Sequence, residues 1–335
     1  MVSPELARDE GRGDRLAVLC GPTAVGKTAV AVVLARCLNA EIICADSRTV
    51  YRGLDVGTAK PDAVLRAAVP HHLLDVVEPT EPFTVADFQR LARRAIEVIR
   101  ARGRLPLLVG GTGLYVRAVV DDLMFPEVAP DAALRARLED EARERGPVHL
   151  HRRLAQVDSA AAERIHPQNV RRVIRALEVA AVAGRPISAQ RRGGGPVPAA
   201  ALVGLTMDRA ALYRRIDQRV EAQLAAGLVN ETRALVARGV TSSAPAMQSL
   251  GYKEIGGWVQ GAYDYAEAVR RLKRNTRRHA KRQLTWFGRD PRVRWLDATE
   301  FLAGDEDATT PDAFEALAAR VHAMMEAEFA AAGSA

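Results

Sequence analysis

The sequence predicts an α/β protein in which a parallel sheet is covered by helices on both faces and interrupted by a helical insertion. In the first third of the 335 residues, short apolar runs alternate with helical patterns. These runs are continuous, as strands buried on both faces require. From about residue 122 to residue 184 the strand patterns stop and only helical patterns are found. A chain of this length suggests two domains, or one domain with a large insertion.

The core is expected to occupy residues 14–121 and 201–298. Apolar runs predict strands at Leu16–Cys20, Glu41–Ala45, His72–Val77, Leu105–Val109, Ala201–Met207 and Val293–Leu296. Apolar residues spaced three and four apart predict helices at Lys27–Leu38, Thr84–Arg102, Asp208–Leu228, Val229–Arg238 and Tyr263–Phe287. Ligands of such sheets bind beyond the carboxyl ends of the strands, so the residues that follow each strand are the candidates for a site.

The insertion is expected at residues 122–200. Its predicted helices are Asp131–Arg145, Val148–Val157, Ser159–Ile165 and Val170–Ala183. The stretch 184–200 is rich in glycine and proline and is predicted to be a mobile linker. At the two ends we expect a disordered tail at 1–13 and a C-terminal tail at 299–335 with one amphipathic helix, near Pro311–Ala330.

Composition limits the classes of function. The net charge of +7 and the pI of about 9.6 favour a polyanionic partner. The three cysteines lack C-x-x-C spacing, so neither a disulfide framework nor a zinc site is indicated, and a reducing cytoplasm is expected. The sequence contains no run of 18 apolar residues, so no membrane span is predicted. The first residues are acidic and polar, unlike a signal peptide.

The most informative motif is a phosphate loop between the first strand and the first helix. It has the pattern G-x-x-x-x-G-K-[ST], which consists of Gly21, Pro22, Thr23, Ala24, Val25, Gly26, Lys27 and Thr28. Its glycines let successive N–H groups point at an anion, and the following helix presents its positive N-terminal end. The lysine adds a charge on the phosphates, and the Thr28 hydroxyl can ligate Mg²⁺. The core is therefore P-loop NTPase-like, and the motif predicts that a di- or triphosphate binds.

Two further clusters follow strands of the sheet. Asp46 and Ser47 follow the second strand, and the glycine-rich turn 110–113 follows the fourth. The strand Leu105–Val109 contains no aspartate of the Walker B kind, which disfavours an ATP hydrolase. Asp46 could be a Mg²⁺ ligand of the Walker B kind, because it follows an apolar strand, and the glycines could form a plain turn.

A strongly basic helix is predicted near the end of the core. Eight basic residues and no acid lie between positions 270 and 282: Arg270, Arg271, Lys273, Arg274, Arg277, Arg278, Lys281 and Arg282. This face could be simply solvated, or it could follow a phosphate backbone. Trp286, just after it, could stack on a base or dock its own helix. A smaller cluster, Arg171, Arg172 and Arg175, lies on the last helix of the insertion.

Several phrases occur together with the phosphate loop. They are Asp46-Ser47 with Tyr51, the run 55–61 (DVGTAKP), the run 70–75 (PHHLLD), the run 107–115 (LLVGGTGLY), Ile165-His166-Pro167, the run 175–179 (RALEV), the run 250–254 (LGYKE) and the run 281–287 (KRQLTWF). In this order they resemble the bacterial tRNA dimethylallyltransferase family, which prenylates N6 of the adenosine beside the anticodon. The resemblance covers about residues 15–297.

The resemblance implies a donor, a cofactor and catalytic residues. The phosphate loop would hold the diphosphate of dimethylallyl diphosphate with Mg²⁺, and Thr28 would ligate the metal. Thr23, Lys27 and Arg219 would stabilise the leaving diphosphate, which is a large contribution when an allylic cation develops. Asp46 matches the general base of the family, and Thr112 matches a further catalytic position.

The resemblance also implies that the insertion grips the anticodon stem-loop of tRNA. The positions that match tRNA contacts of the family are Asp46, Ser47, Arg48, Thr49, Arg135, Arg171, Arg172, Arg175, Gln248, Gly251, Tyr252, Lys253, Arg274, Arg278, Lys281, Arg282, Gln283 and Trp286. No membrane partner is implied, and a monomer is expected. The residues alone leave three alternatives open: a small-molecule P-loop kinase, an adenylate isopentenyltransferase, and an RNA-binding NTPase without transferase activity.

Overall fold

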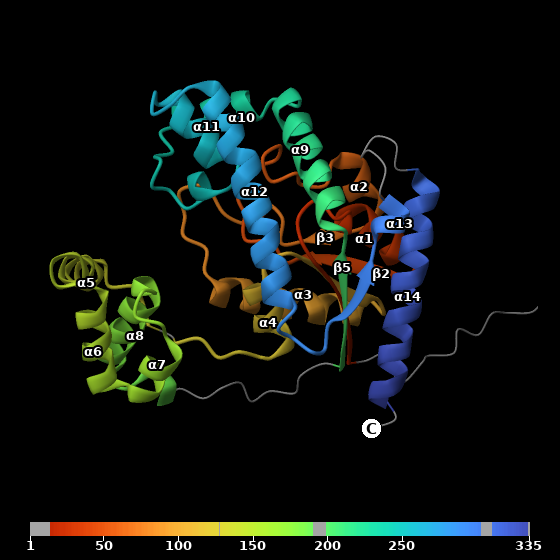
Figure 1. The fold of residues 1–335 in the computed structure, drawn as a ribbon. Helices are drawn as coiled ribbons and strands as arrows, with labels where there is room; N and C mark the ends of the chain where they lie inside the picture. Colours follow the sequence, from red (N-terminus) through yellow and green to blue (C-terminus); the bar gives the residue numbers. More distant parts are fainter. Residues whose placement is uncertain (1–13, 127, 190–198, 303–309, 334–335) are drawn as a thin grey trace, which may run out of the picture. The chain divides into compact units, whose positions relative to one another are not determined.

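The computed structural model describes residues 14–126, 128–189, 199–302 and 310–333. They form two compact units (Figure 1): a larger one from the segments 1–120 and 197–335, and a smaller one from 121–196. The expected disordered tail at 1–13 and residues 190–198 of the expected linker lie outside the described residues.

The larger unit is built on one parallel sheet, which confirms the predicted fold class. Its described strands lie in the order β3-β2-β4-β1-β5-β6, and each neighbouring pair is parallel. Their bounds are β1 (Arg15–Cys20), β2 (Ala40–Cys44), β3 (His71–His72), β4 (Leu105–Gly110), β5 (Ala199–Thr206) and β6 (Arg294–Asp297). The last residue of β1, Cys20, is in register with Gly110 of β4 and Gly204 of β5, so these strands end at one edge.

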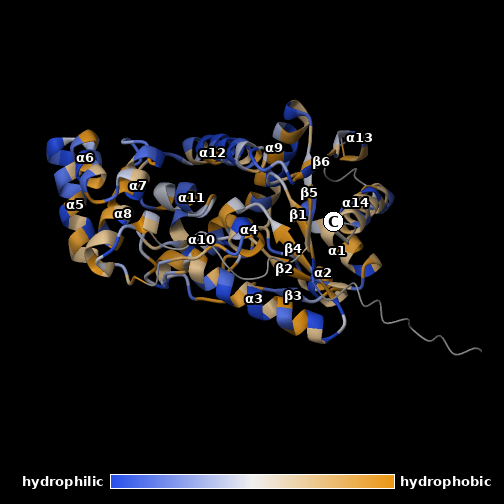
Figure 2. Cartoon of the chain, turned by 90° about the horizontal axis from the view of Figure 1, so that it is seen from below, coloured by the Kyte–Doolittle hydropathy of each residue, from blue (hydrophilic) through white to orange (hydrophobic). Residues whose placement is uncertain are grey.

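Alternation along β1 explains why the sheet is covered on both faces. Leu16, Val18 and Cys20 belong to one buried cluster, while Ala17 and Leu19 belong to another. Successive side chains of a strand point to opposite faces, so a continuous apolar run needs a layer of helices on each side. Figure 2 shows α1 and α14 on one side of the strands and α4 on the other.

The six helices predicted for the larger unit, α1, α3, α9, α10, α12 and α14, begin and end within about three residues of the predicted positions, and α2, α4, α11 and α13 are shorter helices that were not predicted. Their bounds are α1 (Lys27–Cys37), α2 (Ala63–Ala68), α3 (Val85–Ala101), α4 (Gly113–Val120), α9 (Arg209–Ala225), α10 (Leu228–Ala237), α11 (Tyr252–Val259), α12 (Tyr265–Phe287), α13 (Thr299–Leu302) and α14 (Pro311–Gly333). The start of α3 is fixed by a capping box, in which Thr84 and Asp87 each accept from the other's amide. Among the described residues, no helix combines the length and the apolarity that crossing a bilayer requires.

The third strand differs from the prediction. A strand was expected over His72–Val77, but β3 is only His71–His72. The chain leaves the extended conformation at Leu73 and Asp75, which have φ of 65° and 54°. The turn places the Asp75 carboxylate against Lys60 and Arg66. An apolar run in the sequence does not reveal these left-handed residues, so the expected strand was too long.

The C-terminal helix also differs from the prediction, because it belongs to the core. A tail was expected at 299–335, yet α14 packs against α1 and β5. Leu317, Val321, Met325 and Phe329 recur every four residues and are almost fully buried in the same cluster as β1 and α1. A stripe with this spacing covers one face of the sheet, so α14 supplies part of a layer that the core needs.

The smaller unit contains helices and no strand among its described residues. Its elements are α5 (Ala132–Arg145), α6 (Pro147–Val157), α7 (Ser159–Arg164), α8 (Val170–Ala183) and the short 3-10 helix η1 (Ile187–Ala189). Leu138, Leu150, Leu154 and Val173 are central to its own core. The last two residues of the expected insertion, 199 and 200, instead begin strand β5.

Candidate functional site

The candidate site is a pocket of about 680 Å³ at the carboxyl ends of β1, β2 and β4. It is lined by the phosphate loop, the loop that begins at Asp46, the loop 57–61, the turn 110–112 and helices α9 and α12. All lining residues belong to the larger unit. The three strands end together, so the sheet topology brings distant parts of the sequence to one cavity.

The phosphate loop has the backbone that the motif predicts. Gly21, Ala24 and Gly26 have φ of 137°, 66° and 92°, so the chain curls at three positions before α1 begins. Gly21 also approaches the neighbouring strand closely: a Cβ there would lie 2.5 Å from the carbonyl oxygen of Leu205. The exposed Thr28, in the first turn of α1, lines the pocket. A curled loop of this kind, followed by the N-terminus of a helix, is suited to bind an anion, and it is called the anion cradle below.

Two cations lie at this cradle. The Lys27 ammonium donates to the carbonyl of Pro22 at 2.6 Å, across the mouth of the loop. Arg219 enters from α9 and donates to the carbonyl of Thr58 at 3.5 Å. Burial, together with the nearby Arg219 guanidinium, lowers the pKa of Lys27 to about 8, although Asp46 opposes the shift. An anion bound here would relieve the repulsion between the two cations, so the site is electrostatically prepared for a phosphate group.

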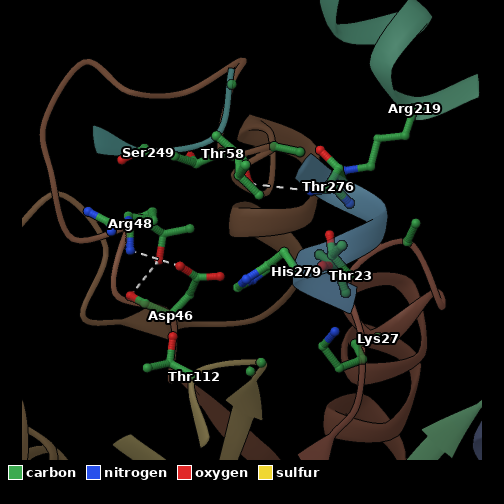
Figure 3. A pocket seen from close by; sticks show the side chains of 18 of the residues that line it. Thr23, Lys27, Asp46, Arg48, Thr58, Thr112, Arg219, Ser249, Thr276 and His279 are labelled. Carbon is green, nitrogen blue, oxygen red and sulfur yellow. Dashed lines mark hydrogen bonds between the residues drawn. The ribbon is translucent and has the colours of Figure 1, made fainter. Parts of the chain in front are cut away.

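Asp46 lies in the same pocket and its carboxylate is oriented by its own loop. Its Oδ1 accepts from the Arg48 amide at 2.8 Å, and its carbonyl accepts from the Thr49 hydroxyl at 3.5 Å. Figure 3 shows the carboxylate turned into the cavity. The Arg48 guanidinium points elsewhere, to the carbonyl of Pro245. Within the described part of the chain, Oδ2 accepts no hydrogen bond, so this oxygen is available to a substrate.

His279 is a site residue that the sequence analysis did not identify. It lines the pocket from α12, and Figure 3 shows its imidazole between Asp46 and Lys27. Burial lowers its pKa; Asp46 opposes this, while Arg282, Lys27 and Arg48 add to it. The ring is therefore neutral at pH 7. Thr276, His279 and Gln283 are three and four residues apart, and such a polar stripe on a predicted helix is a signal that could have found it.

Some basic residues of helix α12 form ion pairs with acidic residues of the described chain, and others do not. Four basic residues reach acids outside the basic run: Arg270 and Arg271 contact Glu267, Lys273 contacts Glu221, and Arg277 contacts Asp217. The other four are exposed and form no ion pair within the described residues: Arg274, Arg278, Lys281 and Arg282. Arg278 and Arg282 also line the pocket. A basic surface thus exists at the mouth of the site, with half the charge that the sequence suggested.

Three of the expected RNA contacts make packing or hydrogen-bond contacts within the larger unit. Tyr252 is fully buried, and its hydroxyl donates to Glu231 and accepts from the Gly57 amide at 3.0 Å. Gln283 is 6% exposed, and Trp286 packs against Gly113. Of the remaining expected contacts nearby, Lys253 and Gln248 are exposed on the pocket wall and Gly251 takes a φ of 90° before α11.

The loop 55–60 is held in place by residues that the sequence analysis missed. The Glu231 carboxylate, on α10, accepts from the amides of Asp55, Val56 and Gly57. Gln223 of α9 donates to the carbonyls of Val56 and Gly57. These contacts fix the wall of the pocket that Arg219 touches. Partners more than 160 positions apart give no signal in a single sequence.

The expected arginines of the insertion fall into two kinds. Arg171 and Arg172 are exposed at the start of α8. Arg135 makes a two-pronged contact of 2.8 Å with the fully buried Glu178, and Arg175 bonds to the same carboxylate at 2.6 Å. Burial alone would raise the pKa of Glu178, but these hydrogen bonds outweigh it and lower that pKa to about 2. Two of the expected RNA contacts therefore hold the insertion together.

The donor set of the pocket fits a magnesium ion that stays largely hydrated. No group of three or more His, Cys, Asp or Glu side chains that could hold a metal occurs among the described residues. Thr28 and Asp46 are oxygen donors in the same cavity. Mg²⁺ typically keeps several waters and binds through one or two protein oxygens plus substrate phosphates, so a dedicated cage is not required.

The comparisons with known proteins agree on one family. Residues 49–290 match the family model described as IPP transferase. The chain is 50% identical to a tRNA dimethylallyltransferase of Geobacillus kaustophilus over 86% of this chain and 91% of that protein, and 52% identical to one of Desulforudis audaxviator over 85% and 92%. A crystal structure of the tRNA isopentenylpyrophosphate transferase of Bacillus halodurans is 42% identical, with a TM-score of 0.67 over 94% of this chain and 98% of that one.

Proposed function

Because this chain belongs to the IPP transferase family and is a tRNA prenyltransferase, we propose that it transfers the dimethylallyl group of dimethylallyl diphosphate to N6 of adenosine 37, beside the anticodon of tRNA. One observation carries the choice of donor and acceptor. A single pocket contains both an anion cradle and an oriented carboxylate, Asp46, and two exposed arginines of α12, Arg278 and Arg282, line it.

The cradle is the donor half of the site. The amides of the phosphate loop, Lys27 and Arg219 would bind the diphosphate. When the C1–O bond of the donor breaks, its electron pair leaves with the diphosphate and the allyl group gains positive charge. Preformed cations and amides stabilise that departing charge without reorganising, which is the largest contribution such a site can make. Thr23 adds a hydroxyl on the same wall.

Mg²⁺ is proposed as the cofactor. Thr28, and the oxygens of the diphosphate, would hold it at the start of α1. When bound, the ion supplies further positive charge for the leaving group.

Asp46 is the acceptor half of the site. The target adenine must leave its stack to reach a pocket, since the reacting nitrogen is inaccessible within a loop of stacked bases. The N6–C1 bond forms as the C1–O bond breaks, and an N6 proton passes to the carboxylate of Asp46. The Arg48 amide holds Oδ1 in place, which leaves Oδ2 to accept that proton.

The exposed side of α12 is proposed to bind the phosphate backbone of the stem-loop. Arg274, Arg278, Lys281 and Arg282 provide the charge, and Lys253 lies on the pocket wall nearby. A monomer is proposed as the active form. A tRNA acceptor and the unpaired thiols Cys20, Cys37 and Cys44 support a cytoplasmic location.

A transfer assay with alternative acceptors tests this function. The protein is incubated with Mg²⁺, isotopically labelled dimethylallyl diphosphate and one of three acceptors: an anticodon stem-loop with three adenosines from position 36, the same RNA with guanosine at position 37, or AMP. We expect label only in the first RNA, recovered as N6-isopentenyladenosine after digestion. Label in AMP would instead support an adenylate isopentenyltransferase. Consumption of ATP with a small-molecule acceptor would support a kinase.

A further inference from the structure

Helix α12 has a buried face opposite its exposed arginines. Along this inner face, Leu272, Thr276, Ala280, Gln283 and Phe287 are buried. Gln283 lies near the end of the stripe, where the helix reaches the sheet edge. A buried amide is costly unless its oxygen and nitrogen are both hydrogen-bonded, so its partners indicate why it is there.

Both ends of the Gln283 side chain are occupied, and by two different loops. Its Oε1 accepts from the amide of Thr23, inside the phosphate loop, at 2.9 Å. Its Nε2 donates to the carbonyl of Gly111, in the turn after β4, at 3.0 Å. One side chain therefore joins the ends of β1 and β4. The next residue of that turn, Thr112, accepts from the Ser47 amide beside Asp46.

The glycines of the turn leave the space that this contact needs. A Cβ on Gly111 would lie 2.0 Å from Nε2 of Gln283. A Cβ on Gly113 would lie 2.0 Å from Cδ1 of Trp286. Real Cβ atoms do not approach other atoms this closely, so any other residue at 111 or 113 would displace the Gln283 amide or the Trp286 ring from its place. The glycine-rich turn is thus shaped to receive α12.

We propose that Gln283 is a positioning residue for the diphosphate cradle, and not a contact of the RNA. The inference rests on the proposed function, because it names which half of that site the residue serves. Gln283 holds the Thr23 amide at a fixed place in the phosphate loop, and it ties that loop to the turn that carries Thr112. Its loss leaves the Thr23 amide and the Gly111 carbonyl without their partner, so the loop loses its anion-binding shape.

Adjacent residues of α12 provide a matched test. Gln283→Met keeps the length of the side chain and removes both hydrogen bonds, whereas Arg282→Gln removes one exposed charge at the neighbouring position. Affinity for inorganic pyrophosphate with Mg²⁺ is measured by calorimetry without RNA, and affinity for the anticodon stem-loop is measured by filter binding. Neither measurement depends on transfer, so a failure of the proposed function is detected separately, by the transfer assay.

We expect Gln283→Met to weaken pyrophosphate binding about tenfold, which corresponds to about 1.4 kcal/mol, while RNA affinity stays within twofold. Arg282→Gln should weaken RNA binding more than Gln283→Met does. In transfer assays, Gln283→Met should raise the KM for the donor and leave the KM for the RNA unchanged. If Gln283→Met instead weakens RNA binding and leaves pyrophosphate binding intact, the proposal is overturned.

A second variant approaches the same contact from the other side. Gly111→Ala places a methyl group where Nε2 of Gln283 lies, so it should also weaken pyrophosphate binding and leave RNA affinity unchanged. The effects of Gly111→Ala and Gln283→Met should be less than additive in the double variant, because each variant disrupts the same contact between Gln283 and Gly111. Fully additive effects would show that Gln283 does not act through Gly111 and would overturn the proposal. Thermal unfolding of each variant identifies any that do not fold.

Discussion

The amide of Ser47 donates a hydrogen bond of 3.1 Å to the hydroxyl of Thr112, which joins the loops that follow β2 and β4. Thr112 was expected to be catalytic, and this contact gives it a way to act, through the loop that carries Asp46. Its own amide donates to the carbonyl of Ala45 at 3.2 Å. The position of the carboxylate in the pocket thus depends on a side chain from the neighbouring strand end.

Thr112→Val should lower kcat about 5- to 30-fold, because it leaves the Ser47 amide without an acceptor, a loss of about 1–2 kcal/mol. RNA affinity should change little. Thr112→Ser keeps the hydroxyl and should retain most of the activity. Single-turnover transfer rates at saturating substrates provide the comparison. Equal loss in the serine and valine variants would mean that the hydrogen bond is not the reason Thr112 matters.

The affinity of the cradle for a diphosphate should fall as the pH rises above about 8. Lys27 has its pKa lowered to about 8, so below this pH the ammonium is charged, and above it the folded protein loses the charge that attracts the anion. Pyrophosphate affinity without RNA, measured from pH 6.5 to 9.5, should decline most steeply above pH 8. Lys27→Arg should remove that decline, because arginine stays charged over the whole range. Parallel curves for the two proteins would contradict this assignment.

Reversing two exposed charges on α12 should weaken RNA binding by a salt-dependent amount. The double variant Arg274→Glu, Arg278→Glu loses two phosphate contacts, so the slope of log K against log salt should become shallower by about 1.4 to 1.8. Arg277→Gln is the matched control. Arg277 is paired with Asp217 on α9, and its removal should leave the slope nearly unchanged. An unaltered slope in the double variant would show that this face of α12 is exposed to solvent and does not bind the RNA backbone.

Glu178→Gln should destabilise the insertion. The substitution takes a charge from a buried carboxylate that holds Arg135 and Arg175, which costs on the order of 2–4 kcal/mol. Because the folded pKa of Glu178 lies at about 2, below its unfolded value of about 4.5, this stabilisation is complete above pH 4.5 and is lost as the pH falls toward 2. Hydrogen exchange in α5 and α8 measures the loss.

Arg171→Ala, an exposed substitution on the same helix, should change stability by less than about 0.5 kcal/mol. Should Glu178→Gln reduce RNA affinity while leaving amide protection in α5 and α8 intact, Arg135 and Arg175 would be RNA contacts rather than structural partners of Glu178.

The sequence predicted most of the sheet because the strands in its middle are apolar on both faces. Strands β1 and β4 were placed within a residue of their bounds, and the phosphate loop was placed completely. The length of β3 depended on two left-handed residues, Leu73 and Asp75, whose side chains do not mark them as such. The position of α14 in the core could not be predicted, because an apolar stripe shows that a helix packs against something but not which element it packs against.

The candidate site was predicted in outline and corrected in detail. The residues that follow the strands, Asp46 and Thr112, lie in the expected place because parallel strands end at one edge. The roles of charged and amide side chains were harder, because they depend on partners far along the chain. Arg277 is neutralised by Asp217, and Gln283 is turned inward to Thr23. A single stretch of sequence shows the charge of a helix but not which face it presents.

In the proposed reaction, one pocket passes an allyl group from a diphosphate bound at Lys27 to an adenine whose N6 proton goes to Asp46. Asp46→Asn is the sharpest test of this reaction, since it removes the proton acceptor and keeps the shape of the side chain. Single-turnover transfer and stem-loop affinity are measured on the same preparation. We expect the transfer rate to fall about 10²- to 10⁴-fold while RNA affinity stays within twofold of that of the unsubstituted protein. A rate and an affinity that fall together by the same factor would contradict it, because Asp46 would then only position the RNA.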